Sequence, residues 1–309
     1  MGSVARSVIV NGSRITGLTR DVIAELVAEI GPLWAAQRHQ RLTRRPRRRA
    51  LGAGARYKLV FVDRLLATLV HLRHGVTHDV LACWFGVDRS TITRAVGEIR
   101  PLLAQRGCTV GPGIRLHTLA DVVDYLGVSG QSAIIDATEV RVRRPSVGAN
   151  GRDRYVSGKS TQNAVKILVV TDARGRLMFG GALQPGSCPD ITQARDAGLV
   201  ELLSRHHDLH ILADAGYQGL GAQTGGQVIT PPHRKFKKNA PAWWEERFIQ
   251  QRKAHSSRRI RVEHGIAHLK NWRALSRHLG RRELLDELVP AIAGLASTHR
   301  QFPGPVAAG

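Results

Sequence analysis

The sequence has little cysteine, and the three cysteines that it contains form no motif. Cys83, Cys108 and Cys188 lie far apart, and no Cys-x₂-Cys pair occurs. Structural zinc sites and the disulfide frameworks of small secreted domains need more cysteines at closer spacing. The sequence therefore argues against both kinds of site, and it fits a protein that works in a reducing compartment.

Long apolar runs are absent as well. No stretch approaches the roughly 20 apolar residues that a helix needs to cross a bilayer. Residues 1–14, MGSVARSVIVNGSR, lack the apolar centre and the small-residue cleavage site of a signal peptide. We therefore expect a cytoplasmic protein that has no membrane partner.

Acidic residues are scarce relative to basic ones. The 309 residues include 46 Lys and Arg but only 24 Asp and Glu, which gives a formal net charge of +22 and a pI near 11.3. A charge of this size concerns partners rather than fold, and a polyanion is the natural partner. A genome-wide arginine bias is the alternative, but +22 on a chain with a globular hydrophobic content of 42% favours nucleic acid.

The first part of the chain is predicted to be helical. Apolar residues at helical spacing indicate helices over 18–40 and 57–73. Between them, residues 41–56 are dense in arginine and are broken by proline and glycine. This segment is either an arm that lies on phosphate groups or a solvated linker. Residues 1–56 are accordingly taken as a helical N-terminal segment with a basic linker.

Residues 57–107 have the layout of a helix-turn-helix domain. Gly86 is expected to end one helix, and Asp88 or Ser90 to cap the next. The residues expected to face inward are Val80, Leu81, Trp84 and Phe85 on the first of these helices and Ile92, Val96, Ile99 and Leu103 on the second. A plain helical bundle has the same pattern, but the basic charge favours DNA binding. The residues expected to contact DNA from the exposed start of the second helix are Arg89, Ser90, Thr91, Thr93 and Arg94.

The pattern changes after a short helix predicted over 117–127. Stretches rich in β-branched and apolar residues, bounded by turn signals, are typical of strands. The predicted strands are 132–142, 164–172, 176–186, 210–214 and 227–232, with a helix over 190–204 and mostly helices from 241 onward. This order predicts an α/β domain.

Three carboxylates stand out in that domain. Asp136 and Asp214 each end an apolar run, and Glu263 lies among apolar residues of a predicted helix. Functional side chains gather where strands end at the carboxyl edge of a sheet. Three carboxylates converging there would repel one another unless a cation lay between them, and Mg²⁺ prefers such oxygen ligands. Taken singly, an aspartate at a strand end is more often a turn residue.

The flanking residues of these carboxylates resemble the three signature blocks of DDE transposases. AIIDATEV contains Asp136, LADAGYQGL contains Asp214, and RVEHGIAHLK contains Glu263. The closest resemblance is to bacterial insertion-sequence enzymes of family five and to the related Harbinger-like group. It covers about residues 131–300 and, more loosely, the helix-turn-helix at 57–107.

The resemblance implies an RNase H-like (retroviral-integrase-like) α/β catalytic domain over 131–300, preceded by the all-α helix-turn-helix domain. It implies that Asp136, Asp214 and Glu263 are the catalytic metal ligands and that the cofactor is Mg²⁺, as two ions, with Mn²⁺ able to substitute. The implied activity is cleavage at transposon ends followed by strand transfer into target DNA. The implied partners are double-stranded DNA and, on that DNA, further copies of the chain, in the bacterial cytoplasm at the nucleoid.

The family's glutamate block has the fuller form Tyr-x₂-Arg-x₃-Glu-x₆-Lys. Arg259, Glu263 and Lys270 match it, whereas Ser256 stands at the tyrosine position. Because Arg259 and Lys270 share one helix face with Glu263, they are expected to contact DNA rather than to form only a solvated surface.

Several other residues have more ordinary interpretations. Glu139 is expected to point away from Asp136, Asp172 to serve a hairpin turn, and Asp190 to cap its helix. Trp243 and Trp244 are expected in the core, with stacking on DNA bases as the alternative.

Two other functions stay open. One is a DNA-binding protein without catalysis, derived from a domesticated or decayed transposase. The other is a site-specific endonuclease that cuts without joining. The presence of all three carboxylates favours an enzyme.

Overall fold

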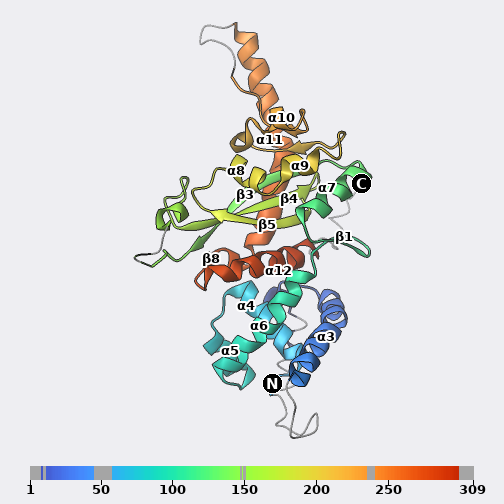
Figure 1. Ribbon diagram of the computed structural model, residues 1–309, viewed down its shortest axis with the longest axis vertical. Coiled ribbons are helices and arrows are strands. Elements are labelled where there is room, and N and C mark those ends of the chain that lie inside the picture. Colours follow the sequence, from blue (N-terminus) through green and yellow to red (C-terminus); the bar gives the residue numbers. More distant parts are fainter. Residues whose placement is uncertain are drawn as a thin grey trace, which may run out of the picture.

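Figure 1 shows the protein as a computed structural model, which describes residues 8–9, 12–44, 58–146, 148, 151–234 and 241–298. A helical region at one end adjoins a sheet covered by helices on both faces. Most of the predicted basic linker, 41–56, lies outside the described residues.

The N-terminal region is helical, as the sequence predicts. Its helices are α2 (Ser13–Thr16), α3 (Arg20–Thr43), α4 (Phe61–His74), α5 (His78–Phe85) and α6 (Arg89–Gln105). The prediction for 18–40 corresponds to α3, and the prediction for 57–73 corresponds to α4. Leucines on α4 are fully buried and join residues of α3 and α6 in one apolar core.

Helices α5 and α6 form the predicted helix-turn-helix. Gly86 ends α5 in the left-handed conformation, with φ of 62°, and Asp88 occupies the N-cap position of α6 without a side-chain capping bond. The residues expected to face inward on α6 are all buried. On α5 the expectation is half wrong, because Leu81 and Phe85 are buried whereas Val80 and Trp84 are 43% and 55% exposed. An eight-residue helix crossing a neighbour buries only a narrow stripe.

A mixed sheet forms the centre of the second region. Its long strands are β3 (Ala133–Val142), β4 (Ala164–Asp172) and β5 (Leu177–Pro185), and its short strands are β6 (Ile211–Leu212), β7 (Val228–Ile229) and β8 (Arg277–His278). The order is β5-β4-β3-β6-β7, with β3, β4 and β5 antiparallel and β6 and β7 parallel to β3. This is the RNase H-like arrangement that the sequence predicts. The hairpin of β1 (Cys108–Gly111) and β2 (Ile114–Leu116) was not predicted.

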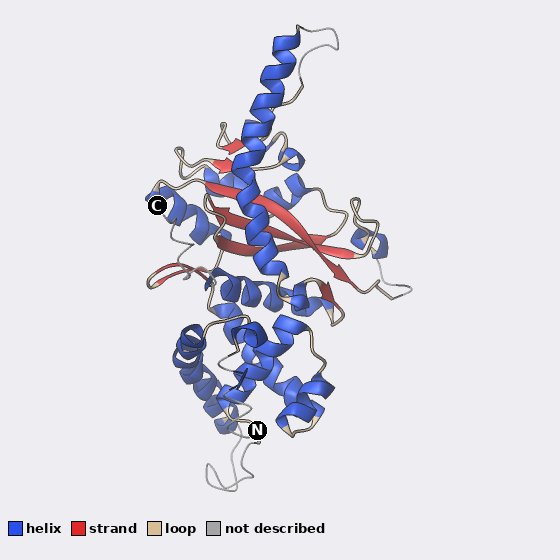
Figure 2. Cartoon of the chain, turned by 180° about the vertical axis from the view of Figure 1, so that it is seen from behind, coloured by secondary structure: helices blue, strands red, loops and turns tan. Residues whose placement is uncertain are grey.

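Helices cover both faces of this sheet. Figure 1 shows α7 (Leu119–Ser129), α8 (Asp190–Asp196) and α9 (Leu199–Leu203) on one face, and Figure 2 shows α11 (Ala242–Lys270) crossing the other. The predicted helix 190–204 is therefore two helices, because Gly198 between them adopts a positive φ of 76°. Alternate residues of β3 and β4 supply the two apolar cores on opposite faces.

Helix α12 (Leu285–Ser297) joins the two regions, because it packs on both α6 and β5. Helix α11 passes behind the sheet and projects beyond it (Figures 1 and 2). Trp243 and Trp244 lie on its projecting part and are 56% and 44% exposed, so the expectation that they belong to the core is wrong. Within the described ranges, no helix combines the length and apolar character needed to cross a membrane.

Candidate active site

Asp136 and Asp214 are brought together by the register of two parallel strands. Ala133 pairs with Ile211, and Ile134 pairs with Leu212. Continuing this register by two residues brings Asp136 level with Asp214. Strand β3 runs to Val142, as predicted, so Asp136 lies within it rather than at its end. Strand β6 is shorter than the predicted 210–214 and stops at Leu212, before Asp214. The sheet edge at the site is therefore made by the end of β6, beside the middle of β3.

Asp214 follows β6 and begins a tight turn. It is the N-cap of the 3₁₀ helix η2 (Ala215–Tyr217), and its Oδ1 accepts a hydrogen bond of 2.7 Å from the Gly216 N–H. Gly219 has a positive φ of 95°, as expected of a glycine that permits a sharp turn. Tyr217, the last residue of η2, is fully buried. Asp214 is thus both a turn residue and a neighbour of Asp136.

Arg259 neutralises part of the charge on Asp136. Its Nη2 lies 2.8 Å from Asp136 Oδ2, and the side chains are only 18% and 14% exposed. Burial raises the pKa of Asp136 above its ordinary value; the charge and hydrogen bond of Arg259 oppose this rise, and the charge of Asp214 adds to it. Burial therefore disfavours the ionised form of Asp136 more than Arg259 favours it.

Glu263 does not contact Asp136, Asp214 or Arg259 through a hydrogen bond or an ion pair. It lies one turn after Arg259 on α11, is exposed, and makes no hydrogen bond or ion pair with the described residues. Among the described residues, no three His, Cys, Asp or Glu side chains are arranged to hold a metal ion. The pair of aspartates is fixed by the sheet, whereas the position of Glu263 depends on how α11 lies across it.

Helix α11 contacts the site through two successive turns. His255 Nε2 lies 2.9 Å from the carbonyl oxygen of Ala213, next to Asp214, and Arg259 follows one turn later at Asp136. Arg259 thus points into the carboxylate pair, and Lys270, at the other end of the same stripe, is exposed. Sequence reasoning missed His255, which no motif marks.

The other acidic residues differ in how well they match expectation. Glu139 accepts hydrogen bonds from the Ser157 hydroxyl (2.6 Å) and the Ser160 hydroxyl (3.2 Å), as befits a structural residue. Asp172 accepts from backbone N–H groups of the β4–β5 turn, as predicted. Asp190 does not cap α8: Pro189 is at the N-cap, and Asp190 Oδ1 instead pairs with Lys166 Nζ at 2.6 Å. The sequence gives no signal for that pair.

The predicted DNA-contacting residues lie together at the start of α6. Arg89, Ser90, Thr93 and Arg94 are exposed, and Thr91 is half-buried. Arg89 is held loosely, 3.5 Å from Asp79, with both side chains about 70% exposed. The Thr93 hydroxyl lies 2.9 Å from His78 Nδ1, which links the start of α6 to α5. These side chains are available to a partner.

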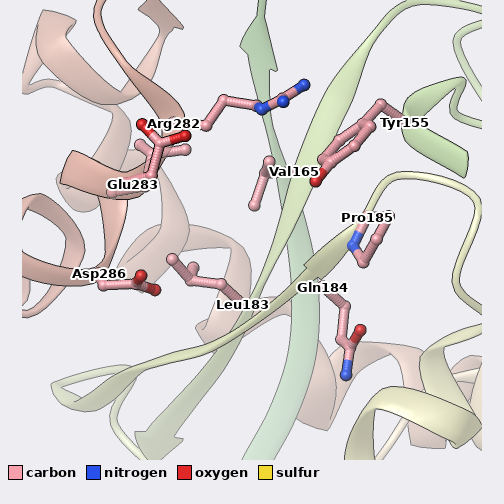
Figure 3. A pocket seen from close by; sticks show the side chains of 9 residues that line it. Tyr155, Val165, Leu183, Gln184, Pro185, Arg282, Glu283 and Asp286 are labelled. Atoms are coloured by element: carbon pink, nitrogen blue, oxygen red, sulfur yellow. The ribbon is translucent and has the colours of Figure 1, made fainter. Parts of the chain in front are cut away.

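A cavity of about 250 Å³ lies elsewhere on the sheet, between β4, β5 and the start of α12. Figure 3 shows Tyr155, Arg282 and Asp286 around it, and the Arg282 guanidinium lies 4.2 Å from the Tyr155 ring centre. None of its lining residues is among the predicted site residues.

Family models, a sequence relative and a solved structure are similar to this chain. Residues 135–297 match the family model of the DDE superfamily endonucleases, and residues 57–109 match the model of the helix-turn-helix of DDE superfamily endonucleases. The chain is 27% identical over 229 residues to a putative transposase for insertion sequence element IS112 from Streptomyces albus G; the match covers 73% of this chain and 75% of that protein. A solved pre-cleavage Mos1 transpososome matches 87% of this chain and 97% of its own at 11% identity, but its TM-score of 0.20 supports no inference.

Proposed function

The chain belongs to the DDE superfamily of endonucleases with an N-terminal helix-turn-helix, a family of DDE-type transposases, and on that premise we propose that it cuts DNA at transposon ends and joins the freed ends to target DNA. Asp136, Asp214 and Glu263 are its proposed catalytic residues. Residues 57–107 are the proposed DNA-reading domain, residues 131–300 the proposed catalytic domain, and residues 1–56 the segment that precedes them.

One observation carries the proposal. The β3–β6 register brings two aspartates from segments far apart in the sequence level with each other, beside an arginine from α11. An ordinary turn aspartate needs no second carboxylate at its side. The raised pKa of Asp136, caused first by burial and opposed only in part by Arg259, is typical of a group arranged for function rather than for stability.

The donor set fits a hard divalent ion. Carboxylate oxygens are the ligands that Mg²⁺ takes, and two aspartates lie here beside one arginine. Asp136 and Asp214 would hold the ions, and Glu263 would join them from α11. Held in this way, divalent ions would supply activation of the attacking oxygen of a phosphodiester displacement and stabilisation of the leaving oxygen.

The remaining roles belong to the chain's own residues. The Gly216 N–H fixes the Asp214 carboxylate, and Arg259 lowers the cost of keeping Asp136 ionised. Lys270 is exposed and available to phosphate. The start of α6 is proposed to read base edges of the terminal inverted repeats, with Arg89 and Arg94 offering the guanidinium groups suited to guanine.

The test uses the full-length protein with DNA fragments that carry the sequences flanking its gene. With Mg²⁺ present, the wild type should cut these fragments, and Asp214→Ala should abolish cutting while leaving DNA binding nearly intact. Asp208→Ala is the matched control, because Asp208 is exposed six residues before Asp214 and its carboxylate makes no hydrogen bond or ion pair with the described residues. Cutting by Asp214→Ala at the wild-type rate would overturn the proposal.

The products decide between the proposal and its alternatives. A transposase yields joined molecules when a target plasmid is added, whereas an endonuclease yields cut ends only. A decayed transposase binds the fragments and leaves them whole.

A further inference from the structure

Asp190 lies against the Asp214 turn although the two are in different parts of the chain. It begins α8, which packs on η2. A Cβ atom added to Gly216 would lie 2.8 Å from Asp190 Oδ2 and 3.0 Å from Asp214 Oδ1. A side chain at this position would push a carboxylate aside, and a glycine avoids this. Because Gly216 has no positive φ, this close approach, and not its backbone conformation, is the reason for the glycine.

The Asp190 carboxylate is anchored on one side and open on the other. Lys166 Nζ from β4 holds Oδ1 at 2.6 Å, and both side chains are largely buried. Oδ2, the oxygen that faces Gly216 and the Asp214 side, accepts no hydrogen bond from the described residues. The strand β4 thus fixes the direction in which the free oxygen points.

A buried polar group without a partner lies at the same place. Tyr217 is fully buried, and its hydroxyl has no hydrogen-bond partner among the described residues. Buried hydroxyls are nearly always bonded, so an orphan of this kind indicates a missing group. Burial raises the pKa of Tyr217 well above its ordinary value, and the negative charges of Asp190, Asp136 and Asp214 add to that rise. The hydroxyl therefore lies in the field of all three carboxylates.

The fixed cations do not balance these carboxylates. Asp136, Asp190 and Asp214 carry three negative charges, and their ion-pair partners Arg259 and Lys166 carry two positive ones. Carboxylates this close repel one another unless a proton or a cation compensates.

We propose that Asp190 is a further metal-binding residue of the candidate active site, in which its free Oδ2 acts beside Asp214 on a divalent ion and Lys166 holds the carboxylate in position. This inference rests on the proposed function. It would add a third carboxylate, from α8, to Asp136 and Asp214. Among the described residues these side chains do not already form a three-residue metal-binding group, so metal binding requires them to move closer.

The test measures Mn²⁺ binding to the full-length protein without DNA, by isothermal titration calorimetry. Asp190→Asn should weaken Mn²⁺ binding about 10–100-fold, the range seen when a supporting group of a metal site is lost. The matched control is Asp196→Asn, because Asp196 is exposed on the same helix and bonds only Gln184 among the described residues. Circular dichroism verifies that both variants fold.

Lys166→Met separates a metal role from a structural one. Removing the ammonium group takes one positive charge away from the site, and this gain should outweigh the looser hold on the Asp190 carboxylate. Mn²⁺ should therefore bind as tightly as to the wild type or a few-fold more tightly. If the pair only supports the fold, Lys166→Met and Asp190→Asn weaken binding alike, and the inference is overturned. It is equally overturned if Asp190→Asn binds Mn²⁺ normally while Asp214→Ala does not. A wild type that binds no Mn²⁺ overturns the proposed function itself.

Discussion

Two buried charge clusters in this molecule respond to burial in opposite ways. In the helical region, Arg106 bonds Glu25 and Glu29 at 2.8 Å and 2.6 Å, and Arg115 pairs with the same two glutamates. Burial alone would raise the pKa of Glu29, but the two arginines outweigh it and hold the pKa below its ordinary value. At Asp136, burial wins over Arg259 and the pKa is raised.

The difference lies in how completely each cluster is paired. Two arginines face two glutamates in the helical region, and each glutamate contacts both. At the sheet, three aspartates face two cations, and a buried tyrosine hydroxyl has no partner among the described residues. A closed network supports a fold, whereas an open one leaves charge for a ligand.

The largest expected effect is on catalysis, at Asp136. Asp136→Asn removes a charge whose burial is unfavourable and keeps the shape of the side chain, so the midpoint of urea unfolding at neutral pH should not fall. Cleavage of transposon-end DNA should fall by roughly 10³-fold or more, as when one member of a catalytic set is lost. A quench-flow or gel assay of cleavage, beside an unfolding curve, measures both. Normal cleavage by this variant would mean that the open cluster is structural.

Glu29→Gln is the control variant in the helical region, and it should have the opposite effects. It removes a charge that its partners favour, so the unfolding midpoint should fall and cleavage should not.

Strand pattern and glycine positions made most of the fold predictable. The runs over β3, β4 and β5 and the Gly86 turn follow from local rules of propensity and capping, and the structure matches them. The proximity of Asp136 and Asp214 can also be predicted from the sequence, because a parallel register aligns two apolar runs that each end in an aspartate. Two contacts cannot be predicted in this way, because they depend on how α8 and α11 pack on the sheet. They are the Lys166–Asp190 pair and the contact of His255 with Ala213. Trp243 shows the same limit: local pattern does not tell whether a helix projects from its domain.

The next largest effect is on stability, at Arg106. Its side chain is 4% exposed and holds two glutamates that are more than a third exposed. Losing one partner of a fully buried pair costs about 3–5 kcal/mol, and the exposure of the glutamates reduces this to about 2 kcal/mol for Arg106→Met. Urea unfolding measures the change. Arg41→Met is the control, because Arg41 is 50% exposed in its pair with Glu98 and should cost less than about 1 kcal/mol. Equal losses in the two variants would contradict the distinction.

A smaller effect is expected when a methyl group enters the open cluster. The Cβ of Gly216→Ala would meet Asp190 Oδ2 and Asp214 Oδ1 at 2.8 Å and 3.0 Å, so the carboxylates must move apart. We expect Mn²⁺ affinity and cleavage to fall about tenfold, which corresponds to about 1.4 kcal/mol, with little change in unfolding. Gly158→Ala is the control, because an added Cβ there meets no described atom within 4 Å. Calorimetry and the cleavage assay measure the effect, and equal behaviour of the two variants would show that the spacing of the carboxylates does not matter.

The smallest effect concerns His71, at which burial also outweighs a favourable contact in the helical region. Burial lowers the pKa of His71 below its ordinary 6.5; the hydrogen bond to the Val76 carbonyl opposes this, and the charge of His78 adds to it. The folded state therefore prefers the neutral ring, so its stability is complete above about pH 6.5 and is lost as the pH falls below that value. The loss is at most about 1.4 kcal/mol per pH unit. His71→Gln should flatten this part of the curve of unfolding free energy against pH, whereas His207→Gln, at an exposed position, should not.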